Sequence, residues 1–307
     1  MKPADQIIFD ARQDRENLRQ TVRRADQQSL AQVLGVLDLF GEFFPSLLGS
    51  IDGVHRLSAF RIYYNDSVHL ARRAWIETTC FYYGVGHALL RNALESLIRG
   101  AFWEGMAHKQ FREEAHVVRR TGQKIGAETR TLLDWFTDFF KHHADARDTL
   151  EQVSASVFDM TSALFSEKSL SRVAPNFKRM LEQVAAWEML NPMEAPVPAI
   201  HDHLYWELSK DAHLIPDKTL MGRRFIEEKK EAFPLIAFHP EELDSFCGAL
   251  GCVADVGMVL SLNLVLMIGD LDDSFHARLA GFDARVSTLL PGLYTAKLFR
   301  KPGTVTA

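Results

Sequence analysis

The sequence has few of the patterns that mark sheet-based or cofactor-binding proteins. Alternating β-branched runs are scarce, and neither a phosphate-binding P-loop nor a dinucleotide-binding glycine pattern is present. The three cysteines are widely spaced in apolar surroundings and form no CxxC pair. These absences exclude a Rossmann-type nucleotide site and a paired-cysteine metal site, so we expect Cys80, Cys247 and Cys252 to be buried thiols.

An excess of positive charge is also lacking. The 35 lysines and arginines are outnumbered by 40 aspartates and glutamates, which gives a formal net charge of -5. This balance excludes a uniformly basic surface, so any contact with nucleic acid would need a local positive patch. With 307 residues, 47% of them hydrophobic and 24% charged, the composition is that of an ordinary globular protein.

The N-terminal stretch MKPADQIIFDARQDREN becomes charged too early to contain the apolar core of a secretory signal. We therefore expect the protein to stay in the cytoplasm. A later stretch, Phe246 to Gly269, is long enough to cross a bilayer. Asp255 lies near its middle, where a charged residue costs about 2.5–3.5 kcal/mol on insertion scales. The stretch is thus expected to be a buried central helix, without a membrane partner.

What the sequence does contain is helical periodicity. Apolar residues recur at three- and four-residue spacing through nearly every segment, which predicts an all-α protein. The expected fold is a multi-helix bundle with a long buried C-terminal helix that opens at Pro240 in the motif HPEEL. Residues 1–50 are expected to form an N-terminal helical arm, and residues 51–307 a bundle domain that includes a proline-rich linker at 191–200.

The helices are expected in stretches separated by glycine, proline and charged turns. Within the arm, the first helix is expected to run from Pro3 toward Val33, with interruptions at Gly35, Gly41 and Pro45. The bundle helices are expected at 58–80, 83–107, 111–141 and 145–190, and in the stretch YWELSKDAH that Pro216 follows.

The stretch YWELSKDAH carries the first candidate site. Residues three or four apart share a helix face, so Tyr205, Ser209 and His213 lie on one stripe. Ser209 and His213 are close enough for a hydroxyl–imidazole hydrogen bond, one ingredient of a nucleophile–base pair. The alternative is that His213 is a partly buried residue satisfied by Ser209 or by a carbonyl near the helix end.

The helix at 83–107 carries the second half of the candidate site. Arg91 and Glu95 lie at i and i+4, beside apolar residues on the same face. Burial of either charged side chain without a partner would cost several kcal/mol. Arg91 and Glu95 must therefore pair with each other or with a third group. They can be a structural ion pair or the partner of the tyrosine, serine and histidine.

Acid–histidine pairs at i and i+3, the helix motif of di-iron bundles, would indicate metal binding. Four pairs have this spacing, but only one contains a glutamate, so the di-iron pattern is not met. They are Asp52 with His55, Asp66 with His69, Glu113 with His116, and Asp273 with His276.

The motifs LLRNALESLIRGAFWEG and YWELSKDAH resemble a broad group of uncharacterised bacterial and archaeal helical proteins, with the patterns R-x-x-x-E and Y-x-x-L-S-x-x-x-H. That group looks related to HEPN-type proteins, many of which are ribonucleases or nucleotide-transfer partners in toxin and defence systems. The HEPN hallmark is an arginine followed by a histidine after four to six residues, and no arginine here has one. A nuclease site would instead need Arg91 and His213 to meet in space.

Three functional hypotheses follow. In the first, Arg91, Glu95, Tyr205, Ser209 and His213 form a buried polar cluster for helix packing or ligand binding. In the second, the same residues serve a metal-independent HEPN-like ribonuclease or phosphoryl-transfer enzyme. The third is a helical-bundle metalloprotein. The expected partner is RNA or another phosphate-bearing ligand, a homo-oligomer is left open, and no cofactor is expected.

Overall fold

The computed structural model describes residues 3–48, 57–108, 111, 176–212, 237–268 and 271–295. These residues are almost entirely helical and contain no strand, which confirms the all-α prediction. The helices are α1 (Pro3–Arg24), α2 (Gln27–Leu48), α4 (Ser58–Thr79), α5 (Tyr83–Ala107), α11 (Phe177–Ala186), the π-helix η1 (Pro198–Tyr205), α12 (Trp206–Ala212), α14 (Pro240–Ile268) and α15 (Phe275–Leu289).

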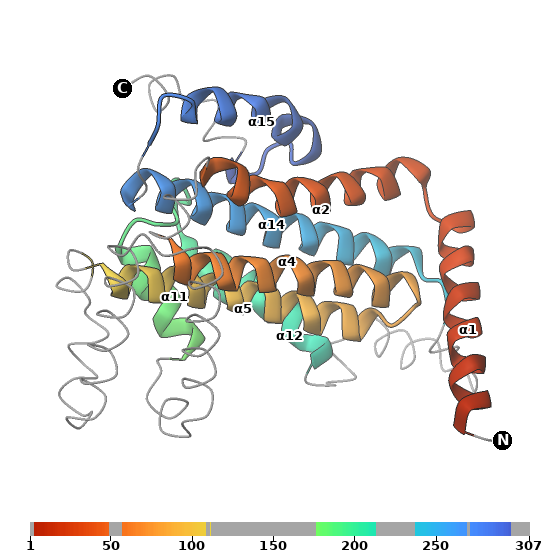
Figure 1. Cartoon of the computed structure of the whole chain (residues 1–307). Helices are drawn as coiled ribbons and strands as arrows, with labels where there is room; N and C mark the ends of the chain where they lie inside the picture. The colour runs from red at the N-terminus through yellow and green to blue at the C-terminus, as the bar shows by residue number, and fades with distance from the viewer. Residues whose placement is uncertain are drawn as a thin grey trace.

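The body of the bundle is formed by α2, α4, α5 and α14 (Figure 1). The antiparallel helices α4 and α5 make its most extensive contact, and α14 packs against both α5 and α2. Helix α15 covers α2 from outside, while α11 and α12 pack against α5. Helix α1 stands across one end of the bundle (Figure 1).

Helix α14 is the long buried C-terminal helix that the sequence predicts. It begins at Pro240, and nearly every residue from Leu250 to Val265 is buried. Gly257 allows the close approach of α2, because a Cβ at that position would meet the Phe40 ring at 2.5 Å. Its one buried aspartate, Asp255, accepts the backbone N–H groups of Tyr294 and Thr295 at 3.0 and 2.8 Å. The carboxylate therefore fastens the chain that follows α15 onto the core.

Among the described residues, α2 and α14 are each long and apolar enough to cross a membrane by length and composition alone. Core helices of soluble proteins have the same properties, and most of the apolar window of α14 is buried inside the bundle. The absence of a membrane partner and the cytoplasmic location stay predictions.

The expected single helix from Pro3 toward Val33 is instead two helices, so that prediction was wrong. The break falls at Asp26, whose carboxylate accepts the Ser29 backbone N–H at 2.7 Å and so caps the start of α2. Gly35, Gly41 and Pro45 lie inside α2 and do not interrupt it. Helix α2 supplies large buried residues to the core, whereas none of the apolar side chains that are described for α1 belongs to it.

Helix α1 is attached to the bundle mainly through polar side chains. Asn17 and Thr21 are buried and donate to the carbonyls of Cys80 and Thr79, at 3.2 and 2.7 Å. These carbonyls belong to the last turn of α4, where no intrahelical donor remains for them. The exposed residues of α1 include Leu18 and Val22.

Several other boundaries differ from the sequence-based prediction. The proline-rich linker is shorter than expected, because η1 already begins at Pro198. Helix α15 follows α14, which was expected to be the last long helix. Most of the stretches 111–141 and 145–190 lies outside the described residues, as does Pro216.

Candidate functional site

The candidate site lies where α12 packs against α5 and where Tyr205, at the end of the preceding η1, reaches Glu95 of α5. Ile200 and Leu208 anchor this segment in the core, each 1% exposed. Tyr205, the last residue of η1, thereby faces the middle of α5 at Glu95. The helices that carry the two halves of the predicted cluster therefore meet.

Glu95 is the centre of this cluster and accepts from three side chains. Arg91 Nε donates to Oε1 at 3.2 Å, and the Tyr205 hydroxyl donates to the same oxygen at 3.1 Å. Arg99 Nη2 donates to the other oxygen, Oε2, at 2.8 Å. The exposed fractions of the side chains are 13% for Glu95, 22% for Arg91 and 46% for Arg99. We call these four residues the Glu95 cluster.

Aromatic rings fix the tyrosine of the cluster. The rings of Phe177 and Tyr205 stack with centroids 4.3 Å apart, and the His201 ring lies nearly parallel to that of Tyr205 at 5.8 Å. The guanidinium of Arg91 lies 4.9 Å from the centroid of the tyrosine ring. These contacts hold the phenol in position to donate to Glu95.

The tyrosine hydroxyl is a donor across the physiological pH range. Burial, followed by the charge of Glu95, raises the pKa of Tyr205 above its ordinary value. The neutral phenol therefore persists beside the carboxylate, since an ionised phenol there would place two negative charges together.

Ser209 is not part of the cluster. Ser209 is 2% exposed, and its hydroxyl donates to the Tyr205 carbonyl at 2.6 Å, one turn earlier in the chain. That bond uses the only proton of the hydroxyl. His213 lies outside the described residues.

Three residues of the site were missed by sequence reasoning. Arg99 lies four residues after Glu95 on the same helix, so the spacing argument that selected Arg91 could have found it. His201 lies four residues before Tyr205 and could have been found in the same way. Phe177 comes from α11, far away in sequence, and no local signal indicates its contact with Tyr205.

The metalloprotein hypothesis gains no support from the described part of the chain, where no three histidine, cysteine or acidic side chains gather to hold an ion. Asp66 instead accepts the Ser96 hydroxyl at 3.0 Å, and His69 and Asp273 are exposed. The pairs Asp52–His55 and Glu113–His116 lie outside the described residues.

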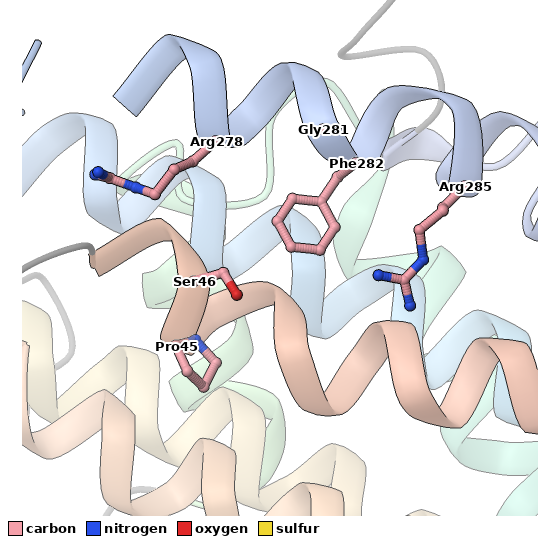
Figure 2. Close-up of a pocket in the computed structure, with 6 residues that line it drawn as sticks. All are labelled: Pro45, Ser46, Arg278, Gly281, Phe282 and Arg285. Carbon is pink, nitrogen blue, oxygen red and sulfur yellow. The ribbon is translucent and has the colours of Figure 1, made fainter. Parts of the chain in front are cut away.

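A shallow groove between α2 and α15 is another place where arginines gather. Figure 2 shows Arg278 and Arg285 on either side of Phe282, opposite Ser46 and Pro45. Both guanidiniums are already paired with carboxylates, Arg285 with Glu42 at 2.7 Å and Arg278 with Asp272 at 3.0 Å. The groove thus has no excess positive charge, unlike the Glu95 cluster, where two arginines share one carboxylate.

Comparison with known proteins adds no relative. No protein-family model, no curated protein and no solved structure matches this chain. The described part of the chain is an all-α helical bundle.

Proposed function

We propose that this protein is a helical RNA-binding protein, and that the Glu95 cluster contacts the phosphates of single-stranded RNA. The observation that carries the proposal is the charge of the cluster: two guanidiniums, Arg91 and Arg99, share the single carboxylate of Glu95. One positive charge is left over on a partly exposed surface.

The donors of the cluster fit a phosphate ligand. A guanidinium has five N–H donors in a planar fork, and Arg91 and Arg99 each direct one bond at Glu95. Arg99 is the more exposed of the two and can turn its remaining donors toward solvent. Glu95 itself is satisfied by three donors, so it holds both arginines in place without needing a ligand.

The surroundings of the cluster favour a nucleic acid over a small anion. Lys178 and Arg179 are exposed on the first turn of α11, next to Phe177, which stacks on Tyr205. Trp206, directly after Tyr205, is 46% exposed. Positive side chains interleaved with aromatic rings are typical of surfaces that bind single strands, because the bases stack while the cations follow the phosphates.

Nearby carboxylates oppose the ligand. Asp202 is hydrogen-bonded to His201 at 2.6 Å and lies near Lys178. The charges of Arg99 and Asp66 both act on the pKa of Tyr63 on α4, so the Arg99 and Asp66 side chains lie in the same region of the surface. Removal of the Asp66 charge should therefore strengthen binding of a polyanion, whereas removal of the Arg99 charge should weaken it.

The test is fluorescence anisotropy with a labelled single-stranded RNA, titrated at several salt concentrations. Arg99→Gln should weaken binding about tenfold, the value of one charge-assisted hydrogen bond, and should lower the salt slope by about 0.7 per lost phosphate contact. Arg72→Gln is the matched control, because Arg72 is also exposed and also pairs with one carboxylate, Asp38, at 3.6 Å. Asp66→Asn should bind more tightly than wild type.

Two results would overturn the proposal: no RNA binding by the wild-type chain, or equal affinities for the Arg99 and Arg72 variants. The same RNA is also run on a denaturing gel after incubation. Cleavage that is lost in Arg91→Ala would replace the binding proposal with the HEPN-like ribonuclease hypothesis, in which His213 is the expected acid or base.

A further inference from the structure

A second hollow lies between α2, α14 and the turn after α15. Its volume is about 440 Å³, within the range of about 300–1,000 Å³ that small-molecule sites occupy. Gly248 and Gly251 of α14 form one wall, and we call the space the Gly248 hollow.

The glycines of this wall differ from the closely packed glycines of the bundle. A Cβ at Gly86, Gly105 or Gly257 would meet a neighbouring atom at 2.0, 2.4 or 2.5 Å, so tight packing explains those positions. A Cβ at Gly248 would meet nothing within 4 Å, and one at Gly251 only Leu290 at 3.6 Å. A glycine inside a helix costs about 0.5–1 kcal/mol relative to alanine, and helix packing does not require it at Gly248. The space in front of Gly248 is therefore open to an occupant.

The walls of the hollow are mainly apolar. Val33 and Val36 of α2 face Leu250 of α14, and Leu289 and Leu293 close the side next to α15. Such walls favour a hydrocarbon body, because burial of apolar surface contributes about 25 cal/mol per Å².

The polar groups of the hollow select the charge of the occupant. Gln32 is already used, since its amide donates to the Leu289 carbonyl at 3.1 Å. Asp244 is exposed at the rim, and no cation among the described residues pairs with it. Burial raises the pKa of Cys247 to about 12, so this thiol stays neutral and adds no second charge at neutral pH. The lining therefore carries a single negative charge.

We propose that the Gly248 hollow binds a small cationic amphiphile, with its hydrocarbon body against Val33, Val36 and Leu250 and its protonated amine beside Asp244. The site is separate from the Glu95 cluster and does not depend on RNA binding. Apolar contact supplies most of the affinity, and the carboxylate supplies the preference for an amine.

The test is isothermal titration calorimetry of the full chain with three probes of equal chain length: octylamine, octanol and octanoate. Octylamine should bind most tightly, about two- to fivefold more tightly than octanol, the range for a solvent-exposed ion pair. Asp244→Asn should remove this preference but keep octanol binding. Gly248→Leu should abolish binding of all three probes by filling the space.

Gly281→Leu is the matched control, because a Cβ at Gly281 of α15 also meets nothing within 4 Å and this glycine lines the other groove. It should bind the probes as wild type does. If Gly248→Leu fails to fold, as judged by circular dichroism, Gly251→Leu fills the same wall from one turn later. Absence of octylamine binding to wild type, or binding unchanged in the folded filling variant, would overturn the proposal. Preference for octanoate would contradict the role of Asp244.

Discussion

At the scale of single residues, Glu95 decides the geometry of the candidate site. A carboxylate that is 13% exposed would be costly if it stood alone. Here Arg91, Arg99 and Tyr205 share its two oxygens, and the three donors come from two helices, α5 and η1. The cluster therefore ties the end of η1 to α5 whether or not a ligand is bound.

Tyr205→Phe should lower the free energy of unfolding by about 1 kcal/mol, because it removes one hydrogen bond to a partly buried carboxylate and keeps the stacked ring. The measurement is chemical denaturation followed by circular dichroism. A double-mutant cycle with Glu95→Gln should give a coupling energy of about 1 kcal/mol. Additive effects of the two substitutions would show that the hydroxyl and the carboxylate do not interact.

Part of this residue-level arrangement could be predicted from the sequence. Arg91 and Glu95 lie one helical turn apart among apolar neighbours, so their mutual pairing follows from helix geometry. The contact between Tyr205 and Glu95 spans 110 residues. It depends on how η1 docks, and local spacing does not encode that. The expected Ser209–His213 hydrogen bond stays a prediction, because His213 lies outside the described residues.

At the scale of helices, Asp255 attaches the chain segment after α15 to the middle of α14. Its carboxylate accepts two backbone N–H groups and also the Thr295 hydroxyl at 2.6 Å. The sequence showed an aspartate in an apolar helix, which argued against a membrane span. It could not show the partner, because Thr295 is 40 residues away.

Asp255→Asn should destabilise the protein by about 2–4 kcal/mol, because an amide NH₂ would replace one acceptor oxygen and face an N–H donor. Urea unfolding measures the loss. Asp38→Asn is the control: Asp38 is exposed and pairs with Arg72 at 3.6 Å, so its loss should change the stability by less than about 0.5 kcal/mol. Equal effects of the two substitutions would contradict the attachment role of Asp255.

Helix boundaries were predicted well where a proline marks the start of a helix or where a sustained apolar face marks its extent. The start of α14 at Pro240 and the whole span of α5 followed from such patterns. The predictions were wrong where a polar side chain caps the start of a helix, and where a helix continues through a residue that usually breaks helices. Asp26 caps α2 by a side-chain bond, and Pro45 lies inside α2.

At the scale of the whole molecule, the tyrosines make stability depend on alkaline pH. The pKa values of Tyr63, Tyr64, Tyr83 and Tyr205 are raised, chiefly by burial, and that of Tyr82 is raised chiefly by its hydrogen bond to Asp14. The folded chain thus keeps phenol protons that the unfolded chain releases.

The free energy of unfolding should be independent of these groups below about pH 10, the ordinary tyrosine pKa, and should fall as the pH rises above it. Urea midpoints measured across this range test the expectation. Tyr205→Phe should reduce the slope of the fall, because one raised pKa is removed. A midpoint that stays constant through the alkaline range would contradict the linkage.

The attachment of α1 affects how its backbone amides exchange with solvent. Asn17 and Thr21 hold this helix through hydrogen bonds to the end of α4, and its described apolar side chains Phe9, Leu18 and Val22 are exposed. We therefore expect its detachment to expose little apolar surface. An opening of this kind responds weakly to denaturant, whereas global unfolding responds strongly. In native-state hydrogen–deuterium exchange, the amides of α1 should therefore exchange through a local opening whose free energy depends little on denaturant. The amides of α14 should exchange only when the whole bundle unfolds.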